Sequence, residues 1–264
     1  MLLAAGRGER MRPLTDTCPK PLLQVAGKPL MQWPLEALAR AGCQRVVINT
    51  AWLGEQISGA FGEHFGLTPE SVWPEALPTL EQLPKAMVLE YSHEGRDFGA
   101  ALETAGGIVR ALPTLCPKAA VGQGHDVFWV LAGDVFAPDF AFDAAEVQRF
   151  VASTALAHIW LVPNPAHNPK GDFGWEPATG LAQNLHPTSD APRYTYSTIG
   201  LYRAALFAPP FCHIAHGNPR GEKAALAPLL RAAMDQGRVT ASLYTGRWTD
   251  VGTPERLAQL NLSV

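Results

Sequence analysis

The first two-thirds of the chain alternate short apolar runs with amphipathic stretches, and this alternation constrains the fold more than any other feature. Short apolar runs are typical of buried strands, and longer amphipathic stretches are typical of helices. Strands that alternate with helices usually form parallel βαβ units. The sequence therefore predicts an α/β protein whose first part is built on parallel strands.

We expect strands at the apolar runs and helices between them. The expected strands are Leu2–Ala5, Arg45–Asn49, Met87–Tyr91 and Val127–Leu131, and the expected helices are Pro29–Ala41, Gly54–Phe65 and one that begins near Thr104. From Ala155 onward, segments such as ALAHIWLV, YTYSTIGLY and VTASLY predict strands of mixed direction around a further helix at Glu222–Gln236. The stretch Gly66–Lys85 carries several prolines and little periodicity, so we expect a surface insertion there.

Composition narrows the functional classes. The chain has 264 residues, of which 47% are hydrophobic and 17% charged, as in a globular protein. A net charge of -3 without clustered Lys and Arg argues against nucleic-acid binding. No apolar run has the length of a membrane span, and the widely spaced cysteines favour neither structural zinc nor a disulfide framework. We expect a cytoplasmic protein that acts on neither nucleic acid nor membrane.

A glycine loop follows the first expected strand. Small residues at Ala4, Ala5, Gly6 and Gly8 allow a ligand to approach backbone N–H groups, and Arg10 and Lys20 add positive charge. This combination favours a polyphosphate site, although a tight turn before a solvated basic loop remains the alternative. A dinucleotide fingerprint needs a glycine at Met11, and a P-loop needs Gly-Lys-Ser/Thr, which the chain lacks. An NAD-dependent oxidoreductase is therefore disfavoured.

Four motifs in this order resemble those of the sugar-phosphate nucleotidyltransferases. They are LAAGRGERMRPLT with PKPL near the start, Leu102–Gly107, Gly133-Asp134, and Trp248–Pro254 (WTDVGTP) near the end. The resemblance runs from Leu2 to about Leu260. It implies a Rossmann-like, three-layer αβα nucleotidyltransferase fold with a mixed, mostly parallel central sheet. It also implies a single domain over residues 1–264, with residues 1–150 mainly binding nucleotide and 151–264 mainly binding sugar phosphate.

Three shorter matches point to one branch of the family, the N-acetylmuramate 1-phosphate uridylyltransferases. They are Asn49–Gly54, Gly171–Gly174 and Arg193–Ser197. This branch implies transfer of UMP from UTP to N-acetylmuramate 1-phosphate in peptidoglycan recycling, with release of pyrophosphate, by a monomer or small homo-oligomer. Mannose 1-phosphate guanylyltransferases share much of the remaining pattern. A sugar-nucleotide-binding module without turnover is a third hypothesis, but it would be expected to have lost the charged motif residues.

The resemblance assigns roles to residues at the matching positions. It implies catalytic roles for Arg10 and Lys20, and Mg²⁺ ligands in Asp134 and Asp250. It implies weaker sugar-phosphate contacts at Asp172, Ser197 and Gly200, each of which could instead shape a turn. The implied nucleotide-binding residues are Leu3, Ala4, Ala5, Gly6, Gly8, Arg10, Glu103, Thr104, Gly106 and Gly107.

Each charged residue also has a structural explanation, and the sequence departs from the family in places. Asp134 could cap a turn after a strand, Asp250 could precede a turn, and Lys20 could be a solvated surface lysine. The opening strand is shorter than is usual in the family. The Gly66–Lys85 insertion and extra residues between Gly95 and Leu102 lie close to where the family recognises its base, so base preference can differ.

Overall fold

The computed structural model describes residues 1–67, 86–117 and 126–263. Most of the expected Gly66–Lys85 insertion, residues 68–85, lies outside these ranges. The chain forms two compact units. The glycine-loop unit consists of Leu2–Ala101, Gly133–Ala144 and Thr249–Val264, and the β12 unit of Met1, Leu102–Ala132 and Ala145–Trp248. Each unit therefore draws on segments from both sides of residue 150.

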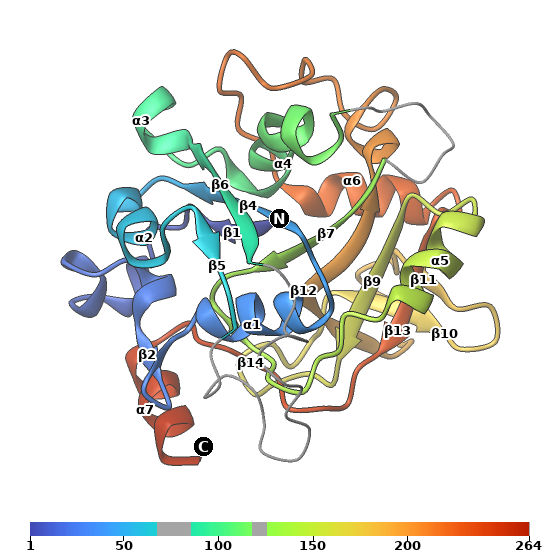
Figure 1. Cartoon of the computed structure of the whole chain (residues 1–264). Helices are drawn as coiled ribbons and strands as arrows, with labels where there is room; N and C mark the ends of the chain where they lie inside the picture. Colours follow the sequence, from blue (N-terminus) through green and yellow to red (C-terminus); the bar gives the residue numbers. More distant parts are fainter. Residues whose placement is uncertain (68–85, 118–125, 264) are drawn as a thin grey trace. The chain divides into compact units, whose positions relative to one another are not determined.

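The glycine-loop unit contains the parallel strands that the sequence predicts. Its strands lie in the order β1, β4, β6 and β5, with β1, β4 and β6 parallel and β5 antiparallel to β6 (Figure 1). Their bounds are β1 Leu2–Ala4, β4 Arg45–Thr50, β5 His64–Phe65 and β6 Met87–His93. The opening strand is short, as expected, and its partner β4 has six residues, nearly all of them buried.

Helices and short ribbons complete this unit. The helices are α1 Gln32–Arg40, α2 Gly54–Phe61, α3 Glu94–Phe98 and α7 Pro254–Ser263, and the 3₁₀ turns are Glu9–Met11, Leu14–Asp16 and Lys20–Leu22. Two antiparallel ribbons pair β2 Gln24–Val25 with β3 Lys28–Pro29, and β8 Val135–Phe136 with β14 Thr249–Asp250. The predicted helix Gly54–Phe65 is too long: Gly62 has a φ of +64°, which ends α2, and the next residues form β5.

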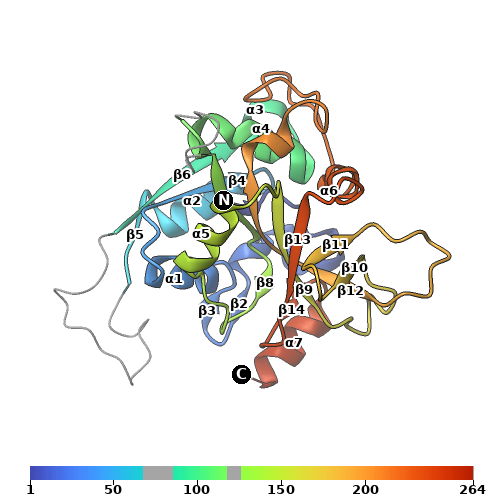
Figure 2. The same ribbon diagram turned by 90° about the vertical axis from the view of Figure 1, so that its right-hand side faces the viewer.

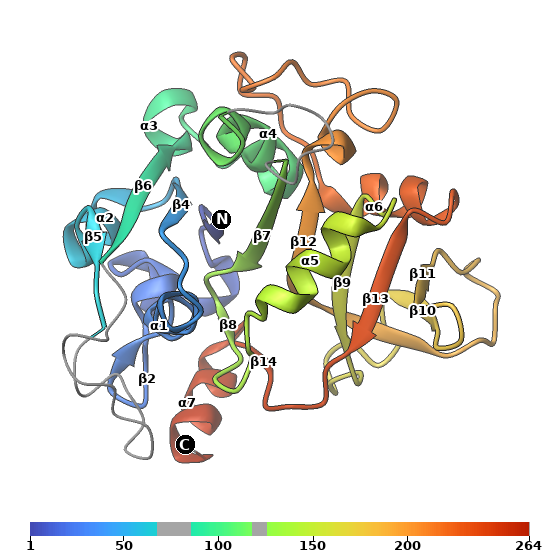
Figure 3. The same ribbon diagram turned by 45° about the vertical axis from the view of Figure 1, so that its right-hand side comes forward.

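The β12 unit is organised around its longest strand. Its strands lie in the order β10, β11, β13, β9, β12 and β7 (Figure 3). Among the described pairs of this unit only β9 and β13 run parallel. The strand β12 is antiparallel to β7, β9 and β10, and β11 is antiparallel to β10 and β13. The strands are β7 Val127–Ala132, β9 Ala157–Val162, β10 Phe173–Glu176, β11 Leu181–Gln183, β12 Arg193–Arg203 and β13 Val239–Leu243. The mixed sheet is thus confirmed, while a mostly parallel arrangement holds only for the glycine-loop unit.

In the described part of the β12 unit, three helices and a 3₁₀ turn accompany the strands. They are α4 Glu103–Leu115, α5 Ala144–Ala152, α6 Leu226–Met234 and the turn Ala204–Phe207. Figure 2 shows α5 and α6 on opposite sides of β9 and β13, and α6 packs against β11 and β13. No described helix of the chain is long and apolar enough to cross a membrane.

A partly buried histidine, His158, lies on β9 of the β12 unit. The Nδ1 atom of His158 is 2.8 Å from the Thr240 hydroxyl, and the His158 ring packs edge-on against Trp160. Its Nε2 atom is buried without a hydrogen-bond partner. Burial lowers the pKa of His158 from its ordinary value of 6.5 to about 4, because the charged ring would lose its hydration.

The lowered pKa of His158 predicts acid sensitivity of the fold. Between pH 6.5 and about 4, the unfolded chain takes up a proton on His158 that the folded protein excludes, so the free energy of unfolding falls as the pH falls. Urea unfolding across this range should give a shallower loss for His158→Leu than for the wild type. His64→Leu, at an exposed position, controls for a general effect of the substitution. Parallel pH profiles for the wild type and His158→Leu would contradict this explanation.

Candidate active site

The glycine loop leaves the end of β1 at a point fixed by buried hydrogen bonds. Leu3 and Ala4 pair with Asn49 and Thr50 of β4. The Ala4 N–H donates to Asn49 Oδ1 at 2.8 Å, and Asn49 Nδ2 donates to Glu94 Oε1 at 2.7 Å. Asn49 is 3% exposed and Glu94 1% exposed, so these bonds form away from solvent. The start of the loop is therefore held by two other segments of the unit.

Gly8 gives the loop its turn. Its φ of +69° is a conformation that a side chain disfavours, and a Cβ atom there would lie 3.0 Å from Thr15 Cγ2. The Gly8 carbonyl accepts hydrogen bonds from the Met11 N–H and the Thr15 hydroxyl, both at 2.8 Å. Gly6, by contrast, is exposed, and a Cβ atom there would meet nothing within 4 Å. The loop therefore presents an open backbone at Gly6 and a fixed turn at Gly8.

Trp52 contacts the glycine loop at two points. Its indole Nε1 donates to the Thr15 carbonyl at 2.9 Å, and the Arg7 guanidinium lies 3.6 Å from the centre of its ring. Trp52 lies within the Asn49–Gly54 match to the family, from which no role was predicted for it. Arg10 is exposed and has no ion-pair partner among the described residues. Its charge is thus available on the surface of the loop.

Lys20 is buried and paired. It is 9% exposed, at the start of the 3₁₀ turn Lys20–Leu22, and its ammonium group donates to Asp134 Oδ2. A charged lysine is rarely buried without a partner. The alternative of a solvated surface lysine is therefore wrong, and two motifs that lie far apart in the sequence meet in this ion pair.

The β8–β14 ribbon brings the two aspartate motifs together. Asp250 lies opposite Val135, and the Val251 N–H donates to the Asp134 carbonyl at 3.1 Å. On the other side, the Gly133 N–H donates to the Leu3 carbonyl at 2.9 Å. A Cβ atom at Gly133 would lie 3.2 Å from that same carbonyl, so a side chain there would crowd this approach. Asp134 is thus held between the first strand and the C-terminal motif.

Arg256 is a residue of this site that the sequence reasoning missed. Its Nη1 atom donates to Asp250 Oδ1 at 2.5 Å and to the Asp250 carbonyl at 3.1 Å. The exposed fractions of the two side chains are 16% for Arg256 and 25% for Asp250. Arg256 follows the WTDVGTP motif closely in the sequence, but nothing in the spacing shows that its side chain turns back to the aspartate.

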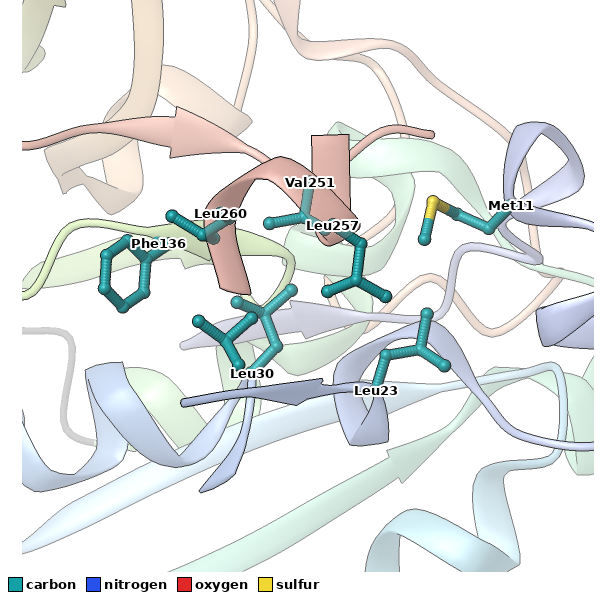
Figure 4. Close-up of a cluster of buried hydrophobic side chains, with 8 residues drawn as sticks. Met11, Leu23, Leu30, Phe136, Val251, Leu257 and Leu260 are labelled. Carbon is teal, nitrogen blue, oxygen red and sulfur yellow. The ribbon is translucent and has the colours of Figure 1, made fainter. Parts of the chain in front are cut away.

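One apolar cluster supports all of these segments. Figure 4 shows side chains from several separate parts of the glycine-loop unit converging in it. Met11 comes from the glycine loop, Leu23 follows the PKPL segment, Phe136 lies in β8, and Val251 follows Asp250. Its members are Met11, Leu23, Val25, Leu30, Phe136, Val251, Leu257 and Leu260. The segments that carry Arg10, Lys20, Asp134 and Asp250 are therefore packed on one common apolar core.

The predicted nucleotide-binding residues of α4 lie in the β12 unit. Glu103 is exposed and has a φ of +60°, and Thr104 is partly buried. The N–H groups of Ala105 and Gly106 donate to the Ala224 carbonyl at 2.9 and 3.1 Å. A Cβ atom at Gly106 would lie 2.5 Å from the Glu222 carbonyl. Gly106 thus permits close packing of α4 against this segment, and Gly107 is buried beside it.

The three weaker sugar-side residues are also in the β12 unit, where each supports local structure. Asp172 accepts a hydrogen bond from the Tyr196 N–H at 2.8 Å. The buried Ser197 accepts one from the Ile199 N–H at 3.2 Å, at an irregularity of β12. A Cβ atom at Gly200 would lie 2.8 Å from the Tyr202 ring. Their role toward a ligand stays a prediction.

Comparison with known proteins agrees with these motifs. The nucleotidyl transferase family profile matches residues 1–264. The chain belongs to the nucleotidyl transferase family. A Neisseria meningitidis protein named N-acetylmuramate alpha-1-phosphate uridylyltransferase is 42% identical over 262 residues, which cover 98% of this chain and 95% of that protein.

Other members of the nucleotidyl transferase family are more distant. The mannose-1-phosphate guanylyltransferase catalytic subunit beta of Drosophila pseudoobscura pseudoobscura is 32% identical over 97% of this chain and 59% of its own. A crystal structure of a Bacillus anthracis protein, assigned as glucose-1-phosphate thymidylyltransferase, matches with a TM-score of 0.69 and 17% identity. That match covers 99% of this chain and 93% of the other, and it confirms the nucleotidyltransferase fold.

The buried bonds at the start of the glycine loop predict the effect of removing Asn49. Asn49→Leu leaves the Ala4 N–H without its acceptor and removes a donor from Glu94, which should lower the free energy of unfolding by about 1–3 kcal/mol. Gln24→Leu, an amide-to-leucine change at an exposed position of the same unit, should change it by less than about 0.5 kcal/mol. Urea unfolding of both variants checks this. An equal effect of the two substitutions would refute the anchoring role.

Proposed function

We propose that this member of the family transfers UMP from UTP to N-acetylmuramate 1-phosphate and releases pyrophosphate. We choose these substrates because the match to the Neisseria uridylyltransferase extends along nearly the full length of both chains. The more distant guanylyltransferase matches over only part of its own length. The geometry supports the reaction class, because the glycine loop, a buried lysine and two aspartate motifs belong to one unit.

The proposed reaction needs no protein nucleophile. A phosphate oxygen of the sugar 1-phosphate attacks the α-phosphorus of UTP and forms a new P–O bond. The bond from the α-phosphorus to the bridging oxygen of the β-phosphate breaks, and pyrophosphate leaves with that electron pair on the opposite side. Catalysis then depends on alignment of the two substrates and on positive charge around a centre crowded with anions.

The residues of the glycine-loop unit supply both requirements. The open backbone from Leu3 to Gly8 would receive phosphate oxygens on its N–H groups, and the exposed Arg10 would contact the β- and γ-phosphates. Lys20, whose charge is fixed in a buried position, would stabilise negative charge near the reacting phosphates. In the β12 unit, Glu103 and Thr104 remain candidates for contact with the base.

The carboxylates of Asp134 and Asp250 fit a magnesium ion. Mg²⁺ is normally held by one or two carboxylates, with phosphate oxygens and waters completing its ligands. Within the described ranges, no group of three or more His, Cys, Asp or Glu side chains could hold a metal on its own. This agrees with a metal that binds together with its phosphates. When bound, Mg²⁺ would supply Lewis-acid charge that neutralises the phosphate oxygens.

The biological setting follows from the proposed substrates. An enzyme that produces UDP-N-acetylmuramate from the sugar 1-phosphate belongs in the recycling of peptidoglycan, which takes place in the cytoplasm. Asp172, Ser197 and Gly200 remain candidates for the sugar-phosphate side. Asp172 and Ser197 each make a hydrogen bond within the β12 unit, and Gly200 packs closely against Tyr202, so each of them also shapes the backbone there.

The experiment that tests this function is a grid of pyrophosphate release in the presence of Mg²⁺. UTP, GTP, dTTP, CTP and ATP are each combined with the 1-phosphates of N-acetylmuramate, glucose, N-acetylglucosamine and mannose. We expect the highest rate with UTP and N-acetylmuramate 1-phosphate. A dominant GTP and mannose 1-phosphate pair would instead assign the guanylyltransferase activity, and no release in any combination would indicate a binding module.

Removing either aspartate should abolish most turnover. Asp134→Ala and Asp250→Ala each delete a proposed metal ligand, so we expect kcat to fall by at least about a hundredfold. Circular dichroism should show that both variants remain folded, although Asp134→Ala should unfold at a lower temperature because it leaves the buried Lys20 without its partner. Asp235→Ala, which removes an exposed carboxylate of the β12 unit, is the control and should leave the rate close to wild type. A near wild-type rate in either site variant would exclude that residue as a ligand.

Lys20 should matter far more than an exposed lysine in similar sequence. Lys20→Ala removes the buried positive charge, and we expect kcat/KM to fall by at least about a hundredfold. Lys170→Ala changes a lysine that also follows a proline but is exposed. The control variant should remain within about twofold of wild type in steady-state pyrophosphate release. Equal rates for the two variants would remove Lys20 from the catalytic residues.

A further inference from the structure

Both aspartates proposed as metal ligands already hold a cationic side chain. Lys20 pairs with Asp134, and Arg256 pairs with Asp250. All four residues belong to the glycine-loop unit. The lysine is part of a recognised motif, whereas the arginine is not. The role of Arg256 therefore requires an explanation that the proposed reaction does not supply.

The position of Arg256 is fixed by its surroundings. It lies in the first turn of α7, where its N–H donates to the Thr253 hydroxyl at 3.4 Å. The next residue, Leu257, packs into the apolar cluster. The guanidinium passes so close to Gly252 that a Cβ atom there would lie 2.3 Å from Arg256 Nη2. The glycine of the WTDVGTP motif thus allows the arginine to reach Asp250.

A guanidinium in this position opposes a free divalent cation. Two positive charges about 4 Å apart repel each other. For a divalent ion beside a single positive charge, this repulsion weakens binding of the ion by about tenfold or more, even at the dielectric constant of bulk water. Asp250 and Arg256 are both partly buried, so screening is weaker than in bulk water. By contrast, the charge that UTP brings is negative. A metal bound to a triphosphate therefore meets much less opposition than a free metal ion.

We propose that Arg256 is a positioning residue that neutralises Asp250 before the metal arrives and keeps the affinity for free divalent cations low. This inference rests on the proposed function. When a metal enters with the triphosphate, the ion pair between Arg256 and Asp250 would open and leave the Asp250 carboxylate to the metal. Lys20 and Asp134 form a second pair of the same kind. The two pairs leave the site without a surplus of negative charge while no nucleotide is bound.

If Arg256 had only a structural role, its loss would change the metal affinity in the opposite direction from the proposed replacement of Arg256 by the metal at Asp250. If Arg256 only orients Asp250 for the metal, its loss should weaken metal binding by about 10- to 100-fold, as the loss of residues that orient ligands usually does. If it competes with the metal, its loss should strengthen binding. The direction of the change separates the two roles, and it does not depend on the rate of the reaction.

The test is a titration of the full chain with Mn²⁺ in the absence of nucleotide, followed by the electron paramagnetic resonance signal of the free ion. Arg256→Gln removes the charge and should lower the Kd for Mn²⁺ by at least tenfold. Arg256→Lys keeps the charge and should remain within about threefold of wild type. Arg45→Gln removes an arginine from an ion pair with Glu90 at the start of β4 and is the matched control. Asp250→Asn should weaken binding in either background.

Each outcome decides the inference. Tighter binding in Arg256→Gln, with wild-type behaviour of Arg256→Lys and Arg45→Gln, supports the exchange. Unchanged or weaker Mn²⁺ binding in Arg256→Gln overturns the inference. Thermal unfolding shows whether Arg256→Gln is folded. If it is unfolded, the inference instead requires tighter Mn²⁺ binding in Arg256→Met. Pyrophosphate release by the wild type is measured separately. Its absence would refute the proposed function, whereas a failed exchange with normal release would refute this inference alone.

Discussion

The ion pair between Lys20 and Asp134 is the contact on which the proposed site depends. Its two residues are 114 positions apart in the chain, so it can form only when the glycine-loop segment and the segment after β7 are folded against each other. A buried lysine without this partner would be costly, and Asp134 would lose the charge that holds it. The apolar cluster beneath the loop makes the pairing possible, because Met11, Leu23 and Phe136 fix the backbone on both sides of it.

The same unit shows how glycines serve a site through close contact between backbone segments. Gly133 lets the backbone beside Asp134 approach the end of β1, and Gly252 lets the Arg256 side chain reach Asp250. Neither of these two glycines has a positive φ, so the reason for glycine is space rather than conformation. Gly8 differs, since its φ of +69° is required for the turn. The motifs of the family therefore combine two separate physical requirements of glycine.

Sequence patterns predicted what depends on local spacing. The strands β1, β4, β6 and β7 and the helices α1 and α4 were found within a few residues, because short apolar runs mark the strands and amphipathic stretches mark the helices. Helix α2 was predicted too long because the conformation of Gly62 overrides the apolar pattern after it. Contacts between distant segments were missed. Neither the bond from Trp52 to the Thr15 carbonyl nor the pairing of Arg256 with Asp250 follows from sequence spacing, because both depend on tertiary packing.

The proposed reaction requires that a sugar 1-phosphate attack the α-phosphorus of UTP at this site. ³¹P NMR of a reaction that contains the protein, Mg²⁺, UTP and N-acetylmuramate 1-phosphate tests it most directly, because every phosphorus atom is seen at once. We expect the UTP and sugar-phosphate signals to disappear together. Equal amounts of pyrophosphate and of a product with the two coupled signals of a diphosphate diester should replace them. Release of orthophosphate with UDP, or an unchanged sugar 1-phosphate signal while UTP is consumed, would contradict it.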